Sequence, residues 1–233
     1  MQAGVFIMYE QFKKPQIMFW FFSKKAKKTI REDDVIWQAE DIKIHNLILR
    51  LADYSHNSDG IMIIAHFPKT LEQLIVSAKK NNLVLKELYT ITDADRWATG
   101  YYNDPVAILS KAIFVSSSQP PMVQEEKKKK IIVAEHFPTP EKDILLMNWA
   151  INVKAESIQW YESTDNPIFT RFGGDQIRIL AEKLGWQQDE SMQHRFITSS
   201  IGSMQEKIFR KSTGDGDAED VMQWFKSYVP SSL

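Results

Sequence analysis

Short runs of aliphatic residues alternate along this chain with longer stretches in which apolar residues recur every three or four positions. The two clearest runs, 61–65 and 131–134, show none of the polar–apolar alternation of a strand with one side in water. Uninterrupted runs are typical of strands covered on both faces, as in a parallel sheet. Further short strands are predicted at 33–37, 83–90, 112–115 and 157–161.

Helical spacing predicts a helix over 40–54, one after each of the two clear strands, and several towards the C-terminus. Four apolar stripes support this: Ile44, Leu47, Ile48 and Leu51; Leu71, Leu74, Ile75 and Ala78; Ile177, Leu180, Ala181 and Leu184; Ile197, Ile201, Met204 and Ile208. Asp217, with Asp220, is expected to open a last short helix. Strands alternating with helices, then helices alone, predict an α/β domain with a helical C-terminal extension.

The predicted elements divide the chain into an N-terminal apolar and basic segment (1–32), an α/β domain (33–165) and a helical extension packed on it (166–233). Residues 93–105 are expected to be a loop with a short helix, and 116–130 an exposed connection. The lysine run 127–130 in that connection is open to an anion-binding interpretation. The neighbouring Glu125 and Glu126 favour a solvated loop instead.

Composition narrows the classes of function. The chain has 233 residues with a formal net charge of -1, which argues against binding nucleic acid through bulk charge. It has no cysteine, which excludes disulfides, thiol nucleophiles and cysteine-based metal sites. The sequence shows neither a signal peptide nor a stretch long enough to span a bilayer, so we expect a cytoplasmic protein.

The apolar stretch 17–22 is the most hydrophobic part of the N-terminal segment. We interpret it as a strand or a docking segment. The alternative is an exposed aromatic patch that contacts a partner or a membrane surface, helped by the lysines that follow it, Lys24, Lys25, Lys27 and Lys28.

Both clear strands run into the same three residues, His66-Phe67-Pro68 and His136-Phe137-Pro138. Proline cannot continue a strand ladder but fits at the start of a helix. Each histidine is therefore expected at the carboxyl end of a strand, where open α/β sheets place ligands. Together with Glu72, Glu135 or Asp143, the two histidines could act as general acid or base, or as metal ligands.

The alternative is structural: each histidine caps its strand-to-helix turn and each Phe-Pro pair packs the junction. We favour it because the histidines and carboxylates lack the spacing of a metal site. His66, His136 and Glu135 therefore remain weak catalytic candidates, and we predict no cofactor and no metal.

One longer segment, 163–177, resembles the end of the second nucleotide-binding domain of SecA, the ATPase motor of bacterial preprotein translocation. That family has a short acidic turn, an apolar pair, Arg-Phe-Gly and a helix ending in Leu-Gly. The corresponding residues here are Asp165, Ile168-Phe169, Arg171-Phe172-Gly173 and Leu184-Gly185. Residues 34–43 are similar to the entry into the same domain. The resemblance covers about 33–208 and implies a RecA-like fold of the P-loop NTPase type.

The catalytic motifs of that family are missing from this sequence. There is no Gly-x-x-x-x-Gly-Lys-Ser/Thr loop to hold phosphates and no Asp-Glu-Ala-Asp-like stretch. The family's Gly-Arg-Gly-Thr-Asp segment is expected after a strand ending at Val115, where the chain reads Ser116-Ser117-Ser118-Gln119. Residues 145–152 replace the segment with the arginine finger, a group worth about a thousandfold or more in phosphoryl transfer. The resemblance therefore implies a degenerate motor domain.

Three functional hypotheses follow. The preferred one is a non-catalytic interaction or scaffold module with an unidentified protein partner and no nucleic acid. The second is half of an ATPase that a partner chain completes. The third is a small-molecule hydrolase that uses a crevice between His66 and His136.

Overall fold

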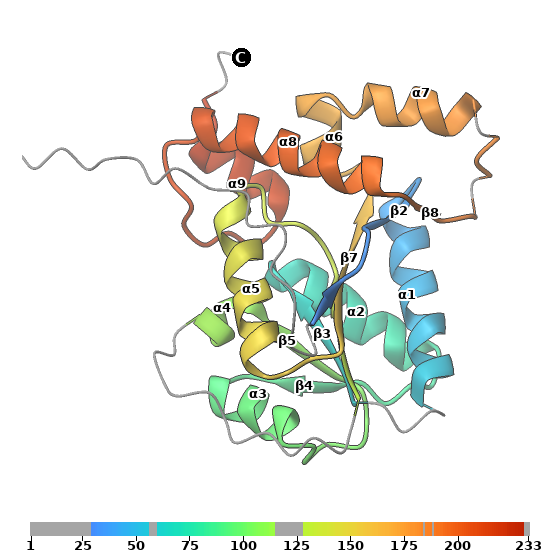
Figure 1. The fold of residues 1–233 in the computed structure, drawn as a ribbon, viewed down its shortest axis with the longest axis vertical. Coiled ribbons are helices and arrows are strands. Elements are labelled where there is room, and N and C mark those ends of the chain that lie inside the picture. Colours follow the sequence, from blue (N-terminus) through green and yellow to red (C-terminus); the bar gives the residue numbers. More distant parts are fainter. Residues whose placement is uncertain (1–28, 56–59, 115–127, 184, 188, 231–233) are drawn as a thin grey trace, which may run out of the picture.

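The computed structural model describes residues 29–55, 60–114, 128–183, 185–187 and 189–230. Within these ranges eight strands form one sheet in the order β4-β5-β3-β6-β7-β2-β8, and β1 also pairs with β7 (Figure 1). All pairs are parallel except β2 with β8. The strands are β1 (Ile30–Arg31), β2 (Val35–Trp37), β3 (Gly60–Ala65), β4 (Lys86–Leu88), β5 (Val106–Leu109), β6 (Lys129–Val133), β7 (Ser157–Ser163) and β8 (Met192–Gln193).

Helices follow most of these strands. They are α1 (Glu40–Ser55), α2 (Pro68–Lys80), α3 (Ile91–Ala98), α4 (Ser110–Phe114), α5 (Pro140–Asn152), α6 (Pro167–Phe172), α7 (Asp175–Lys183), α8 (Arg195–Lys211) and α9 (Val221–Tyr228). Pro68 and Pro140 stand in the first turns of α2 and α5, where a missing N–H costs nothing. The predicted α/β fold, with a mostly parallel sheet between helices and a helical C-terminal extension, is confirmed.

Both faces of the sheet are covered, which explains the uninterrupted apolar strands. Along β3, Met62 and Ile64 enter a core beneath α3, α4 and α5, whereas Ile61 and Ile63 enter a second core beneath α1 and α2. Successive strand residues point to opposite faces, so a strand buried on both sides must be apolar at every position.

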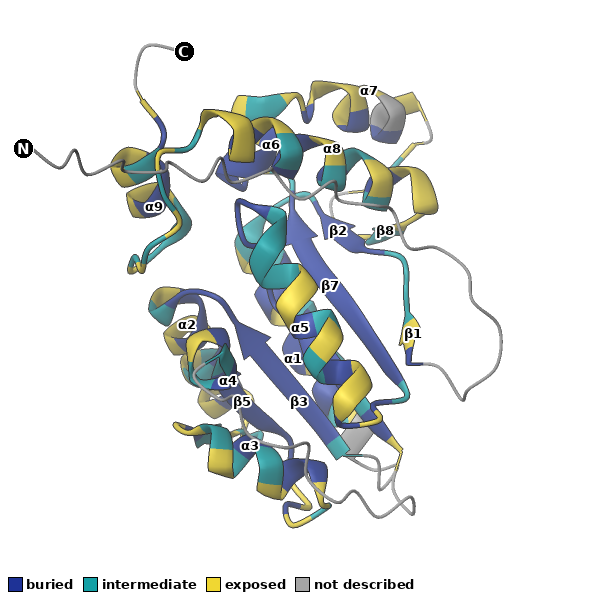
Figure 2. Cartoon of the chain, turned by 60° about the vertical axis from the view of Figure 1, so that its left-hand side comes forward, coloured by how far each residue is buried: buried dark blue, intermediate teal, exposed yellow. Residues whose placement is uncertain are grey.

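A third core lies at the carboxyl end of the strands. There Ile36 of β2 and the two phenylalanines of the repeat, Phe67 and Phe137, pack against apolar residues of α6, α8 and α9, including Ile197 and Trp224. Figure 2 shows this helical layer across the end towards which β3 and β7 point. The extension therefore covers the edge where an α/β sheet places its ligands.

One predicted strand is wrong. The expected strand at 112–115 is replaced by α4, which ends at Phe114, and the strand of this region is β5, six residues earlier. Two short apolar runs stand next to each other here, and periodicity cannot separate a buried strand from a buried helical turn. The strand pairing shows which run is the strand, because Met62 to Ala65 of β3 lie opposite Val106 to Leu109. The residues after the true strand, Ser110-Lys111-Ala112, still contain no Gly-Arg-Gly segment.

Two smaller expectations also need correction. Lys129 and Lys130 belong to β6 instead of an exposed loop, and Lys129 is only 3% exposed. The last helix begins after Asp220, whose side chain accepts a hydrogen bond from the Gln223 amide, so Asp217 does not open it. The apolar stretch 17–22 and residues 116–127 lie outside the described residues. In the described ranges, none of the helices has the length and hydrophobicity needed to cross a membrane.

Candidate functional site

The two histidines of the repeat meet at one carboxylate. β3 and β6 are parallel neighbours, so His66 and His136 emerge side by side at their carboxyl ends. His66 Nε2 lies 3.0 Å from Asp143 Oδ1, and His136 Nδ1 lies 2.6 Å from Asp143 Oδ2. Asp143 comes from the first turn of α5 and also accepts a 2.7 Å hydrogen bond from Gln205 of α8. The site thus joins two strands to the extension.

The contacts continue beyond each histidine. His66 Nδ1 lies 2.9 Å from the Ser110 hydroxyl, at the end of β5. On the other side, His136 Nε2 lies 3.3 Å from Asp34 Oδ2, whose second oxygen binds Arg31 at 2.7 Å. The result is a chain of polar side chains that is mostly buried.

This environment fixes the charge of the central groups. Burial by itself lowers the pKa of His136, but Asp34 and Asp143 outweigh it and raise that pKa to about 10. Burial also opposes ionisation of the two aspartates, and the neighbouring His136 nevertheless holds the pKa of Asp143 and of Asp34 below its ordinary value. At neutral pH, His136 is therefore an imidazolium between two carboxylates.

A second polar cluster surrounds a fully buried lysine of α1. Lys43 Nζ donates to the Ala134 carbonyl at 2.7 Å, and it lies 2.9 Å from Glu40 and 3.9 Å from Glu162. The carboxylate of Glu135 adds to the field at the same lysine. Glu135 and His136 follow each other in sequence but serve different clusters, because the chain leaves β6 at Val133 and turns.

This cluster holds more acidic than basic side chains. Burial lowers the pKa of Lys43, but its glutamate neighbours raise it above its ordinary value. Burial raises the pKa of Glu162 to about 7 and also raises that of Glu135, and in both Lys43 offsets part of the effect. One ammonium thus balances three carboxylates, and two of these are destabilised as anions by burial.

The carboxylates of Glu135 and Glu162 accept hydrogen bonds from backbone amides near the strand ends. Glu135 accepts from the amides of His66 and Phe67 at the end of β3. Glu162 accepts from the amide of His136 at 3.0 Å and from that of Ser163 at 2.9 Å. Amides at strand-to-helix turns are the donors that phosphate-binding loops offer to an anion. Here the anions are part of the protein.

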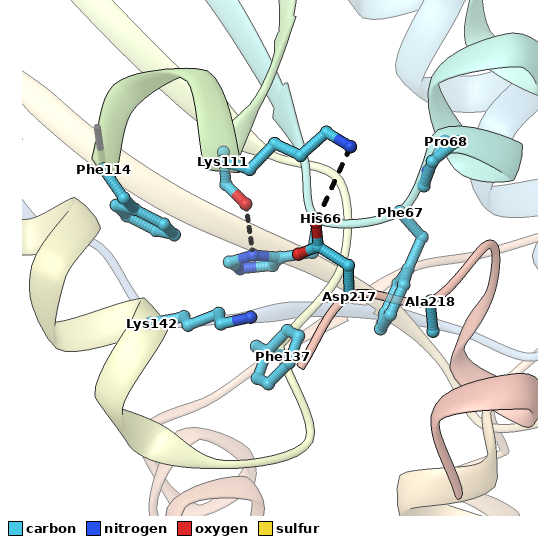
Figure 3. A pocket seen from close by; sticks show the side chains of 10 residues that line it. His66, Phe67, Pro68, Lys111, Phe114, Phe137, Lys142, Asp217 and Ala218 are labelled. Carbon is cyan, nitrogen blue, oxygen red and sulfur yellow. Dashed lines mark hydrogen bonds and ion pairs between the residues drawn. The ribbon is translucent and has the colours of Figure 1, made fainter. Parts of the chain in front are cut away.

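Cavities lie beside both clusters in the described part of the chain. One has a space of about 200 Å³ open to the centre of a water molecule and is lined by Glu40, Glu135, Asp165 and the starts of α2, α6 and α9. The other lies between His66, Ser110 and Phe137 (Figure 3), and its space open to the centre of a water molecule is about 20 Å³. That is enough for about one water molecule. Among the described residues, no three His, Asp or Glu side chains are arranged to hold a metal ion.

The structure brings together His66, His136 and Asp143, one of the three carboxylates that the sequence offered as partners, and it places Glu135 nearby in the other cluster. Glu72 is exposed on α2 and lies outside both. Sequence reasoning missed Asp34, Lys43 and Glu162. Lys43 left a signal, because it adjoins Ile44 and precedes Leu47 by four positions, on the apolar face of its helix. Asp34 and Glu162 gave no such signal, since His136, which both of them contact, is distant in sequence.

No protein-family model matches this chain. A 58-residue segment is 31% identical to the protein translocase subunit SecA of Alkaliphilus oremlandii (strain OhILAs), and it covers 25% of this chain and 6% of that protein. Against SecA of Acidithiobacillus ferrooxidans (strain ATCC 53993 / BNL-5-31), identity is 36% over 50 residues, covering 22% of this chain and 6% of SecA. The matches thus span a small part of the relatives' length.

Two solved structures are also similar. The C-terminal part of the Fun30 ATPase domain has a TM-score of 0.41 at 16% identity, covering 72% of this chain and 52% of its own. The C-terminal domain of a possible DNA helicase from Lactobacillus plantarum WCFS1 has a TM-score of 0.35 at 11% identity, covering 59% and 74%. These scores are too low to carry an inference about function. By sequence, about a quarter of this chain is similar to SecA.

Proposed function

We propose that this protein is a RecA-like relative of the second nucleotide-binding domain of SecA that acts as a protein-interaction module and does not hydrolyse ATP by itself. We place it in the cytoplasm. Its structural role is to present a rigid α/β scaffold to a partner protein.

One observation carries this proposal. The backbone amides at the ends of β3 and β6, where a nucleotide-binding sheet offers donors to phosphate, are bonded to Glu135, Glu162 and Asp143. A bound phosphate would have to displace buried carboxylates that already satisfy these donors, and would meet their negative charge. The missing glycine-rich loop and arginine segment agree with a sheet edge that no longer binds nucleotide.

The test is a calorimetric titration of the full chain with ATP and ADP, each with and without Mg²⁺. We expect no saturable binding at micromolar concentrations, with a nucleotide-binding protein as positive control. Micromolar affinity would contradict the proposal. If crosslinking recovers a partner, ATPase activity of the complex that neither protein has alone would instead support the partner-completed motor.

A second candidate function rests on the contacts of Ser110. Its hydroxyl, His66 and Asp143 form a hydrogen-bonded series of nucleophile, base and orienting carboxylate, with distances of 2.9 and 3.0 Å. A hydrolase acting on a small substrate would use this series. Ser110 is only 2% exposed, which favours the interaction module.

A fluorophosphonate probe decides this second candidate. Labelling that is lost in Ser110→Ala and in His66→Gln, and kept in a control variant of the exposed Ser203, would support a hydrolase. Equal labelling in all four proteins, or none in the wild type, would exclude Ser110 as a nucleophile.

A further inference from the structure

Two lysines from different helices reach the same opening beside His66. Lys111 extends from α4 and Lys142 from α5, and both line the small cavity with Phe137 (Figure 3). Asp217 and Ala218 of the extension also line it. Part of the cavity lining therefore comes from a segment that is distant in sequence from the sheet.

Both lysines contact a segment of the extension. Lys142 Nζ donates to the Asp215 carbonyl oxygen at 2.9 Å. Lys111 Nζ lies 3.8 Å from Asp217 Oδ2. The Asp215 carbonyl and the Asp217 carboxylate, two residues apart, are thus the groups that contact the two ammonium groups. Both belong to the acidic segment 215–217, which follows α8 and precedes α9.

The site favours an acidic occupant for an electrostatic reason. Burial lowers the pKa of Lys142, and the negative charges of Asp215 and Asp217 offset part of that effect. The ammonium also lies 4.0 Å from the centre of the Phe137 ring, which offers a weaker attraction. Without the acidic segment, this partly buried charge would lose its carboxylate neighbours.

The acidic segment is anchored by backbone hydrogen bonds on both sides. The Thr213 amide donates to the Tyr228 carbonyl at 2.8 Å, and the Lys69 amide donates to the Glu219 carbonyl at 3.1 Å. Between these anchors, the Lys111 and Asp217 side chains are 55% and 73% exposed. Exposed ion pairs of this kind contribute little to stability. A competing acidic peptide therefore loses little by replacing the Lys111–Asp217 ion pair.

We propose that Lys111 and Lys142 form a docking site for an acidic segment of a partner protein, and that residues 215–217 occupy this site as a built-in competitor. The proposal rests on the interaction role above and names the chemistry of the partner. A partner segment with a carboxylate two residues after an exposed carbonyl reproduces the contacts already present. Binding of the partner then releases the acidic segment from the opening.

The experiment uses the full chain and a fluorescein-labelled peptide with the sequence of residues 212–219, followed by fluorescence anisotropy. Asp217→Asn weakens the internal competitor, so we expect it to bind the peptide about fivefold more tightly than the wild type, the size of one exposed ion pair. Lys111→Gln and Lys142→Gln, each in the Asp217→Asn background, should lose that gain. Asp189→Asn removes another exposed acid of the extension and should behave like the wild type.

The outcomes separate this proposal from its alternatives. Equal affinity in the wild type and Asp217→Asn would overturn it, as would binding that survives both lysine substitutions. An equal gain in Asp189→Asn would show a general charge effect and would also overturn it. Dimerisation of Asp217→Asn would assign the site to a second copy of the chain in place of a partner. Nucleotide titrations are independent of all these results, so failure here leaves the absence of ATP binding to be judged separately.

Discussion

At the residue scale, both histidines of the repeat contact Asp143, but the two histidines have different roles. His136 is 2% exposed and carries a positive charge between Asp34 and Asp143, and its ring stacks on Trp160 with 5.7 Å between centroids. His66 bonds to Ser110 and Asp143, and its ring meets Phe137 edge-on. The same three-residue motif therefore yields a buried ion pair in one copy and a hydrogen-bonded junction in the other.

Replacing His136 tests the buried ion pair. His136→Leu leaves two buried carboxylates facing each other without the cation, so we expect a loss of about 3–5 kcal/mol in the free energy of unfolding. Urea unfolding measures it. His45 is exposed on α1, and His45→Leu should change stability by less than about 0.5 kcal/mol. Similar losses in both variants would contradict the assignment.

The same groups predict how stability depends on pH. The pKa of His136 is raised in the folded state from its ordinary value of 6.5, so its contribution is complete below pH 6.5 and is lost as pH rises to about 10. The pKa values of Asp34 and Asp143 lie below the ordinary value of 3.8, so their contribution is lost as pH falls through and below that value. Glu162, raised from 4.5 to about 7, lowers stability as pH rises between those values.

Together these groups place maximum stability in mildly acidic solution, with losses on both sides. Urea midpoints measured across the range from acid to alkaline pH check this. The alkaline loss should be much smaller in His136→Leu, because the group that releases the proton is gone. A wild-type stability that increases steadily from neutral pH towards pH 10 would refute this picture.

At the scale of elements, the prolines of the repeat predicted one of the two helix starts. Pro68 begins α2 as expected, because the ring fixes φ and the missing N–H is not needed there. After the second copy, the helix begins at Pro140, two residues beyond Pro138. The strand β5 was missed because its four residues and the following helical turn are both apolar. The helix α6 ends at Gly173, which has a φ of +109°.

A pair of glycine substitutions tests these helix boundaries. Gly173→Ala puts a side chain in a left-handed conformation and should cost about 1–2 kcal/mol. Gly202 lies inside α8 with open space around it, so Gly202→Ala should stabilise the protein by about 0.5–1 kcal/mol. Thermal and urea unfolding would show the two shifts. Opposite signs are the expected result, and a shared sign would argue against one of the two conformations.

At the scale of the whole molecule, the extension and the sheet share a core. Phe67 and Phe137 belong to the α/β part, while Trp224 and Phe225 come from α9, and all four lie in one apolar cluster. Gln205 adds a polar link by donating to Asp143 and to the Phe137 carbonyl. Such shared burial favours unfolding as one cooperative unit.

We therefore predict a single urea transition with the same midpoint by far-UV circular dichroism and by tryptophan fluorescence. Phe225→Ala, in the shared core, should destabilise the whole chain by about 3–5 kcal/mol and shift both signals together. Phe196 is 43% exposed on α8, and Phe196→Ala should have a much smaller effect. Separate midpoints for the two signals would show that the extension unfolds independently.

The sequence by itself determined the local structure and the class of fold. Apolar runs such as 61–65 and 131–134 can be buried on both faces only in a sheet between helices, and Pro68 after the first run places a helix start. Parallel pairing then brings the carboxyl ends of neighbouring strands to one edge, so the meeting of His66 and His136 was also foreseeable.

Only the tertiary structure decided which charges lie together. Asp34, Lys43 and Glu162 acquire their roles from partners 102, 91 and 26 residues away, and no local pattern identifies those partners. The same holds for Asp217, which the sequence suggested as a helix start and the fold places beside Lys111. Local propensity depends on neighbours in the chain, whereas the energy of a buried charge depends on whatever the fold brings within a few ångströms.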